Sequence, residues 1–311
     1  ALASDTLGAR NIAIGVGALD TQNFTTATSV YNVAIGYDAG TAVTTGIQNT
    51  LIGALAGDAL TDADYNVAIG YLALTSDTLG SRSVAIGRGT LEVQNFTSAT
   101  DVYNVAVGWK AGAAVTTGQN NTFVGANAGA QVTTGSNNTA IGTDALRTGS
   151  PGGPATSDSN VVGLGDENIA SLHCQVALTV SSDQRDKTDF VDLDLGLDFV
   201  KGLEPVTYYW DKRSKYGDKY ADDYDLNAQT PDGTHKEDWM DVGFKAQSVQ
   251  ALEEAAGYTS AAKKNLTVSV NADGKQLGLK YEKFIPILVK AIQDQDAIIT
   301  ALTARIEALE S

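Results

Sequence analysis

The 311-residue chain is poor in several residue types on which common protein classes depend. It has a single cysteine, Cys174, so an intrachain disulfide is excluded and stability has to come from packing. It has only 21 lysines and arginines against 37 aspartates and glutamates. The net charge of −16 argues against nucleic acid as a partner, because binding phosphates requires clustered cations. We expect the charge to serve solubility.

The chain also lacks a run of about 18 apolar residues, so we expect no membrane insertion. The start of the chain, from Ala1, has no basic residues and does not resemble a signal peptide. No second cysteine or histidine lies at ligand spacing from His173 and Cys174. We therefore expect no metal, no other cofactor, and a packed position for both residues.

Glycine, in contrast, is abundant and unevenly distributed. Of the 32 glycines, 24 lie before residue 181, together with only five of the 21 basic residues. This change in composition predicts two kinds of structure. We divide the chain into residues 1–146, a linker and neck at 147–181, and residues 182–311.

The first segment consists of repeats of the type Asn-x-Ala-Ile-Gly. Their closing glycines follow one another at one regular spacing, with a slightly longer step at the first and fifth intervals: Gly15, Gly36, Gly53, Gly70, Gly87, Gly108, Gly125 and Gly142. The segment Ser4–Gly8 also returns as Ser76–Gly80, which indicates duplication of a four-repeat block. A fixed repeat period is typical of solenoids.

Each repeat contains a short β-strand. In Asn32–Gly36, Val33 and Ile35 share one face and Ala34 occupies the other, which fits a strand covered on both sides. A second step of small residues, such as Ala39-Gly40, predicts a second short strand in each repeat. One repeat cannot bury its own apolar face, but stacked repeats can. Because large side chains are few, we expect three chains to associate and supply the missing burial.

These repeats resemble the head repeats of trimeric autotransporter adhesins and similar repeats in phage tail fibres. The resemblance covers residues 11 to about 146 and implies a trimeric rod, mainly β, of the β-roll or β-helix type. A purely structural shaft is the simplest interpretation of so regular a segment. Tyr37, Tyr71 and Trp109 each follow a repeat glycine. They are candidates for stacking on sugars or for packing between layers.

The neck begins with a turn-rich stretch and becomes apolar again towards Val180. The turn residues are Gly149, Pro151, Gly152, Gly153 and Pro154. Val176, Leu178 and Val180 then alternate as in a strand.

A serine and a lysine lie five positions apart directly after the neck, at Ser182 and Lys187. A serine hydroxyl becomes a nucleophile when a base removes its proton, and a lysine amine can serve when burial or nearby cations keep it neutral. Arg185 is such a cation. A solvated loop is the alternative for this segment alone.

Three further motifs follow in order: Gly202–Trp210, Val242–Gln250 and Leu279–Ile292. Together with the Ser-Asp-x-Arg-x-Lys pattern they resemble the endosialidase-type intramolecular chaperones, the peptidase S74 family. The resemblance implies a self-cleaving serine endopeptidase with Ser182 as nucleophile, Lys187 as base, Asp183 and Arg185 in support, and scission at Ser181–Ser182. Two features depart from the pattern: Asp211–Asp241 is an insert, and Ser181 is a second candidate nucleophile.

The pattern of apolar residues predicts an α+β fold for residues 182–311. Helices are expected at Leu195–Leu203 and Ala246–Ala256, with a strand at Pro205-Val206 between them. Residues 288–311 have the spacing of a coiled coil. Its seam is formed by Leu288, Ile292, Gln295, Ile299, Leu302, Ile306 and Leu309. The seam pattern alone favours two strands, whereas the family resemblance implies three.

The resemblance therefore implies a tail fibre or tailspike segment of a virion tail, assembled in the host cytoplasm. Its C-terminal chaperone drives formation of the homotrimer and then releases itself by autoproteolysis. The resemblance implies other phage tail proteins and a host cell-surface glycan as partners. The alternatives are an adhesin-like fibre with a retained, non-cleaving trimerisation domain, and a regulator released by the same cleavage. A glycosidase is disfavoured, because residues 1–181 offer only loop carboxylates such as Asp62, Asp64 and Glu92.

Overall fold

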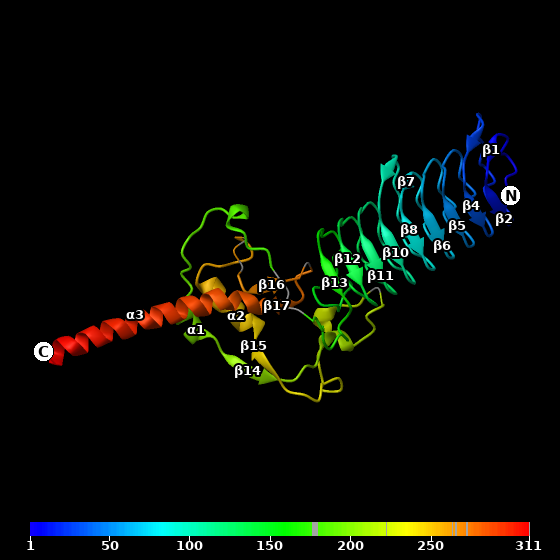
Figure 1. The fold of residues 1–311 in the computed structure, drawn as a ribbon. Coiled ribbons are helices and arrows are strands. Elements are labelled where there is room, and N and C mark those ends of the chain that lie inside the picture. The colour runs from blue at the N-terminus through cyan, green and yellow to red at the C-terminus, as the bar shows by residue number, and fades with distance from the viewer. Residues whose placement is uncertain (176–179, 222, 263, 265, 272, 311) are drawn as a thin grey trace. The chain divides into compact units, whose positions relative to one another are not determined.

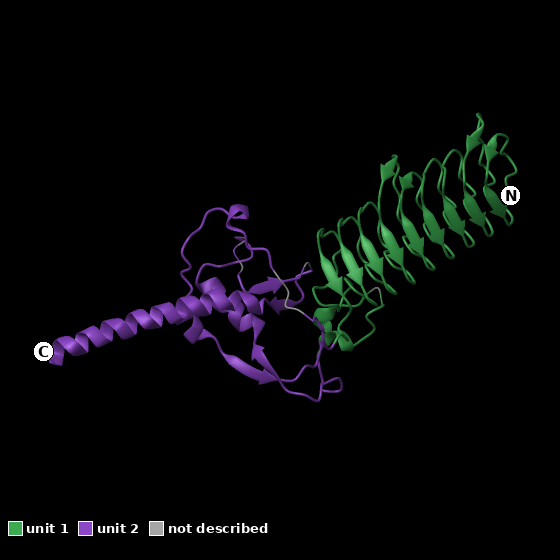
Figure 2. Cartoon of the chain, in the orientation of Figure 1, with its two compact units in different colours: residues 1–169, 213–230 green, residues 170–212, 231–311 purple. Residues whose placement is uncertain are grey.

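The computed structural model describes residues 1–175, 180–221, 223–262, 264, 266–271 and 273–310. The chain forms two compact units (Figure 2). Unit 1 contains residues 1–169 and 213–230, and unit 2 contains residues 170–212 and 231–311. No helix among the described residues is long and apolar enough to cross a membrane. Val176 and Leu178, two of the three residues predicted to alternate in the neck, lie outside the described residues.

Unit 1 is a β-solenoid whose coils each add one strand to a nine-stranded parallel sheet (Figure 1). Neighbouring strands pair in register, so that Ala34 lies beside Leu51 and Leu51 beside Ala68. The predicted β-repeat rod is confirmed. The strands of the sheet are β2 (Ile12–Ile14), β4 (Val33–Ile35), β5 (Thr50–Ile52), β6 (Val67–Ile69), β8 (Val84–Ile86), β10 (Val105–Val107), β11 (Thr122–Val124), β12 (Thr139–Ile141) and β13 (Val162–Leu164).

The middle residue of each strand points into the coil, where large and small side chains compensate one another. Six of the nine strands place Ala there, and four of these six coils, such as that of Ala68, fill the opposite turn with a leucine such as Leu74. Ala68 and Leu74 are both fully buried. Leu51 reverses this arrangement, because Gly57 stands opposite it and a β-carbon at Gly57 would lie 2.8 Å from Leu51 Cδ2. Phe123 is accommodated in the same way between Gly112 and Gly129. The core is therefore filled coil by coil to the density that protein interiors require.

The repeat asparagines form a buried ladder along the inside of one corner. Asn49 Oδ1 accepts a hydrogen bond from the main-chain N–H of Asn66 at 2.9 Å. Its Nδ2 donates to the carbonyl oxygen of Ala63 at 2.7 Å. The same pair of bonds recurs at Asn66 and Asn121. Each of these asparagines thus satisfies two main-chain groups of the next coil, which explains why this position repeats.

The closing glycines stack so closely that a side chain would not fit. A β-carbon at Gly53, whose φ is +129°, would lie 2.7 Å from the carbonyl carbon of Gly70. The predicted second strand is wrong. The step after each glycine is a tight turn, because residues such as Leu55 and Leu72 have φ of 58° and leave the extended conformation.

Each of the two longer coils carries an additional short strand, which pairs outside the main sheet with a short strand of the segment before it. β1 (Gly8–Ala9) pairs with β3 (Thr28–Ser29), and β7 (Gly80–Ser81) pairs with β9 (Thr100–Asp101). In the coil before the second longer one, the buried carboxylate of Asp77 accepts hydrogen bonds from the N–H of Gly80 in its own coil and from the N–H of Phe96 and Gln94 Nε2 in the longer coil. The extra residues therefore form a small projection beside the main sheet, and the hydrogen bonds to the Asp77 carboxylate hold it in place.

The outward face of the nine-stranded sheet is apolar along its middle. Its two central columns consist of residues such as Val33, Ile35, Val67 and Ile69, all partly exposed, and Ile14 at the first coil is 58% exposed. The single chain therefore covers one side of each strand, the alanine side, and leaves the valine and isoleucine side uncovered.

Unit 2 is an α+β assembly in which the predicted helices and strand are confirmed. α1 (Leu197–Gly202) contacts α3 (Phe284–Glu310), and the main-chain N–H of Leu197 donates to Asp294 Oδ2 at 3.1 Å. Further elements are β14 (Pro205–Tyr208), β15 (Asp241–Phe244), α2 (Ala246–Ala255), β16 (Val268–Val270) and β17 (Leu277–Leu279). The core of the unit contains Leu195, Phe199, Val249, Val268, Phe284 and Ile287.

Candidate functional site

The segment from Ser182 to Lys187 folds into a short turn that brings its ends together. Asp183 caps a 3-10 helix at Gln184–Asp186, and its carboxylate accepts a hydrogen bond from the N–H of Arg185 at 2.9 Å. An aspartate at this position satisfies a main-chain donor that the helix leaves unpaired. The main-chain N–H of Lys187 then donates to the carbonyl oxygen of Gln184, which ends the helix.

This turn places the ammonium of Lys187 against Ser182. Lys187 Nζ lies 2.5 Å from Ser182 Oγ and 3.3 Å from the carbonyl oxygen of Ser182. A serine hydroxyl and an amine at hydrogen-bond distance have the geometry of a nucleophile and its general base. The structure therefore brings together the two residues that the sequence predicted as a dyad.

The two predicted supporting residues form an ion pair with each other. Arg185 Nη2 lies 2.6 Å from Asp183 Oδ2, and Arg185 Nε also donates to this carboxylate. The hydrogen bonds from Arg185 lower the pKa of Asp183 below its ordinary value. The guanidinium is thus engaged by a carboxylate, and the pair stabilises the turn on which Lys187 and Ser182 stand.

Solvent reaches every residue of the dyad segment in the single chain. Ser181, Ser182, Asp183, Arg185 and Lys187 are all exposed. Base catalysis by lysine requires the neutral amine, which burial or nearby cations favour. In the single chain, Lys187 therefore contacts Ser182, but the two side chains are not buried.

His173 and Cys174 are also exposed, so the predicted packed position is wrong for the single chain. Ser171 Oγ lies 3.0 Å from His173 Nε2.

Tyr37, Tyr71 and Trp109 point outward on the rod, at 58%, 46% and 47% exposure. These three aromatic side chains therefore do not pack between the layers of the rod in the single chain.

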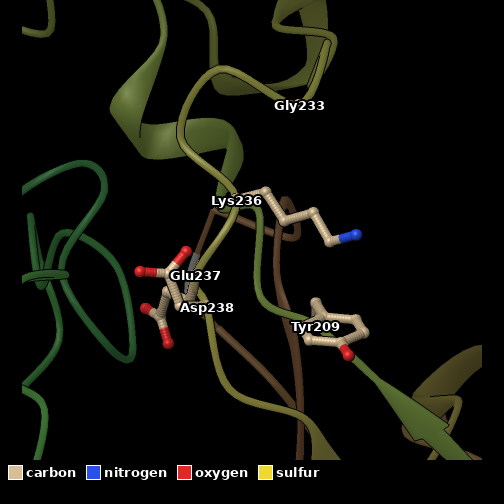
Figure 3. Close-up of a pocket in the computed structure, with 5 residues that line it drawn as sticks. All are labelled: Tyr209, Gly233, Lys236, Glu237 and Asp238. Atoms are coloured by element: carbon tan, nitrogen blue, oxygen red, sulfur yellow. The ribbon is translucent and has the colours of Figure 1, made fainter.

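A separate cavity of about 360 Å³ lies in unit 2 and is lined by Tyr209, Gly233, Lys236, Glu237 and Asp238 (Figure 3). Lys236 Nζ lies 4.3 Å from the centre of the Tyr209 ring, in a cation–π arrangement. Figure 3 shows the Glu237 and Asp238 carboxylates turned away from that lysine. None of the predicted dyad residues lines this cavity.

One further group of charged residues could not be inferred from the sequence. Most of the predicted insert, residues 213–230, belongs to unit 1 together with the rod. Lys219 Nζ lies 3.0 Å from Asp144 Oδ2 and 2.8 Å from Glu167 Oε1. Both partners precede the dyad in the sequence, and no local spacing pattern connects positions so far apart.

Residues 182–258 match the model of the family described as chaperone of endosialidase, peptidase S74. The match supports a chaperone domain in this part of the chain. It covers about a quarter of the chain and begins at Ser182, the serine of the dyad. Comparisons with curated proteins and with solved structures gave no match. What the family implies for the domain is an intramolecular chaperone with a self-cleaving peptidase activity.

Proposed function

We propose that the chain is a phage tail fibre or tailspike segment whose C-terminal chaperone assembles three β-rods and then frees itself by cutting the Ser181–Ser182 bond. The observation that carries this proposal is the 2.5 Å contact between Lys187 Nζ and Ser182 Oγ at the first residue of the chaperone match. The repeats resemble tail-fibre repeats and supply the rod.

The dyad suggests how the bond breaks. Neutral Lys187 takes the proton of the Ser182 hydroxyl, and Ser182 Oγ attacks the carbonyl carbon of Ser181. The bond from that carbon to the Ser182 nitrogen breaks, and the nitrogen leaves as an amine after gaining a proton. Water then hydrolyses the Ser181–Ser182 ester, which yields a carboxylate at Ser181 and restores the hydroxyl.

Association of three chains completes this site in the proposal. The dyad is exposed in the single chain, and enclosure by neighbouring copies would favour the neutral amine. Cleavage then follows assembly, and unassembled chains stay intact.

Two apolar surfaces support association with further copies of the chain. One is the outward valine and isoleucine face of the rod, including Ile12, Ile14 and Ile141. The other is the seam of α3, where Ile292, Ile299, Leu302 and Ile306 are each more than half exposed. Exposed apolar surfaces of this extent mark sites of association. Three helices in a coiled coil would cover the seam, and three rods would cover the sheet face.

The order of events has a physical reason. Parallel strands pair slowly, because a whole coil of chain separates each strand from its partner in the next coil, and a slip of one residue would turn every side chain to the wrong face. A C-terminal domain that trimerises first raises the effective concentration of the three rods and sets their register. Cutting the covalent link to the domain afterwards makes assembly irreversible, so that the assembled rods are kinetically stable.

The test is a denaturing gel with mass measurement, combined with sedimentation to determine the oligomeric state. Wild type is expected to be trimeric and to give two fragments, 1–181 and 182–311. Ser182→Ala and Lys187→Met are expected to remain trimeric and full-length. Ser181→Ala is the matched control, and it should cut at the same bond. A trimeric wild type that keeps its full mass would overturn the peptidase part of the proposal.

The solvent exposure of the dyad favours one alternative, an adhesin-like fibre that keeps its trimerisation domain. An uncleaved trimeric wild type supports this alternative, whereas the two fragments exclude it.

For the mature rod we propose host attachment at the virion tail, through a surface glycan. Exposed aromatic residues beside cations support it: Arg88 lies over the Tyr71 ring at 5.7 Å, and Lys110 Nζ over Trp109 at 5.3 Å. Aromatic faces stack on sugar rings, and cations bind acidic sugars. A glycan array with the mature trimer tests this, and Tyr71→Ala and Trp109→Ala are expected to lose the binding. No binding by wild type would remove the glycan from the proposal.

A further inference from the structure

Residues 213–230 follow the predicted scissile bond, Ser181–Ser182, in the sequence. In the structure, however, they pack with residues 1–169, which precede that bond. They belong to the segment that matches the chaperone family, yet they form part of the same compact unit as the rod (Figure 2). Their partners are at the C-terminal end of the solenoid, in the turn after β12 and in the residues that follow β13.

The contact is built around a lysine in an acidic pocket of the rod. Lys219 Nζ lies 3.0 Å from Asp144 Oδ2, 2.8 Å from Glu167 Oε1 and 3.5 Å from Asp166 Oδ2. The Lys219 side chain is 14% exposed, and those of Asp144 and Glu167 are 3% and 6% exposed. All three acids come from the rod side, and the lysine comes from the chaperone side. Charge complementarity of this kind is a feature of specific interfaces.

Tyr220 strengthens the same contact. Its hydroxyl donates to Asp144 Oδ2 at 2.8 Å, and the guanidinium of Arg147 stacks on its ring at 4.5 Å. Removing one partner of a buried ion pair leaves the other charge uncompensated, which is costly. Buried pairs are also screened by salt much less than exposed ones. The arrangement thus suits a contact that persists without a covalent link.

We propose that residues 213–230 are a latch, a noncovalent link that holds the C-terminal fragment on the end of the rod after the Ser181–Ser182 bond is cut. Lys219 in the pocket of Asp144, Asp166 and Glu167 sets how long the fragment remains bound. The latch rests on the proposed function for the scission step, and its contacts exist in the uncut chain.

The experiment uses full-length chains that have cut themselves. Size exclusion under native conditions, followed by a denaturing gel, shows whether the two fragments co-elute. Wild-type fragments are expected to co-elute, and Lys219→Gln is expected to speed their separation at least about tenfold. Lys201→Gln is the matched control, because Lys201 pairs with Asp198 at an exposed position of unit 2. Co-elution of the Lys219→Gln fragments as tight as that of wild type would overturn the latch.

Tyr220→Phe removes a single hydroxyl from the contact and provides a second variant with little risk to folding. Its fragments should separate faster than those of wild type and more slowly than those of Lys219→Gln. Lys219→Arg keeps the positive charge and should restore part of the retention. Separation rates that are the same in wild type, Tyr220→Phe and Lys219→Arg would contradict the assignment.

A second experiment tests the latch independently of the proposed peptidase activity. Ser182→Ala carrying a recognition sequence for a specific protease between Val180 and Ser181 is cut by that protease into nearly the same fragments. If wild type stays full-length, the peptidase proposal fails, while this experiment still measures retention with and without Lys219. If these fragments part at once in the chain that keeps Lys219, the latch fails whatever the peptidase does.

Discussion

The main-chain N–H of Asn66 donates a hydrogen bond of 2.9 Å to the side-chain oxygen of Asn49, one coil earlier, and both residues are fully buried. Asn49→Ala therefore leaves this N–H and the carbonyl oxygen of Ala63 without these partners inside the rod. Each buried unsatisfied group costs about 1–3 kcal/mol. Chemical denaturation should show a loss of that order for the rod. Thr97→Ala, at an exposed loop position of the rod, is the control and should change stability by no more than about 0.5 kcal/mol.

Leu51 and Gly57 form a second pair whose sizes are matched. Leu51→Ala should cost about 2–5 kcal/mol by opening a cavity. Gly57→Leu alone should cost about 1–3 kcal/mol, because its β-carbon would lie 2.8 Å from both Leu51 Cδ2 and Leu60 Cδ1. The double variant reproduces the pair Ala68 and Leu74 of the next coil, where Leu74 has the φ of 57° that Gly57 also has. Thermal unfolding should find the double variant more stable than either single variant, and simple additivity of the two losses would refute this account of the core.

The exposed seam of α3 predicts which substitutions prevent assembly. Ile299→Asp places a charge where the coiled coil would bury an apolar side chain, and sedimentation should show loss of the trimer. Ile299 is 53% exposed in the single chain, so the fold of unit 2 should survive, as circular dichroism can establish. Thr300→Asp, one position off the seam, should leave the trimer intact. A trimer that tolerates both changes would mean that α3 does not form the seam.

The latch should weaken in acid. Burial alone would raise the pKa of Asp144, but hydrogen bonds from Tyr220 and Lys219 and the Lys219 charge outweigh it, so the pKa lies below its ordinary value. A carboxyl with a lowered pKa stabilises the bound state above its free pKa, and this contribution is lost as the pH falls through the bound one. The interactions with Glu167 and Asp144 raise the pKa of Lys219 despite its burial, so its charge persists across neutral pH.

Retention of the C-terminal fragment should therefore be constant near neutrality and begin to fall below about pH 4, where the separated Asp144 takes up a proton while the bound Asp144, whose pKa is lower, stays ionised. Asp166, Glu167, Arg147, Tyr220 and Tyr224 are the other titratable groups of this site. Size exclusion at about pH 7 and at about pH 3, above and below the ordinary aspartate pKa of about 3.9, measures the change. Asp144→Asn should weaken retention already at neutral pH and show a smaller further loss in acid. A wild type with equal retention at both pH values would contradict this prediction.

The repeated positions made much of the rod predictable. Asparagine, the alternation around Ala34 and the closing glycines all follow from one periodic pattern, so the strand and the corner of each coil could be located from the sequence. The second strand was predicted wrongly, because residues such as Leu55 adopt a positive φ that leucine rarely takes outside a dense array of neighbours. Stacking of identical turns, a tertiary effect, outweighs the local preference.

The contact between Lys187 and Ser182 was predictable because both residues lie in one short turn, where five positions of chain return Lys187 to Ser182. The position of the insert was not, because the contact of Lys219 with Asp144 joins two distant parts of the sequence and depends on the stacked coils already being in place.

The in-register pairing of all nine strands has a consequence for how such a shaft changes in size. Since Ala34, Leu51 and Ala68 occupy equivalent places in successive coils, a whole coil can be deleted or duplicated and its neighbours will meet the same main-chain pattern as before. The acidic pocket that binds Lys219 belongs to the final coil and the turn after β13, so it is indifferent to how many coils precede it. The number of coils, and with it the length of the rod, can therefore change by whole units while the site that binds Lys219 stays the same.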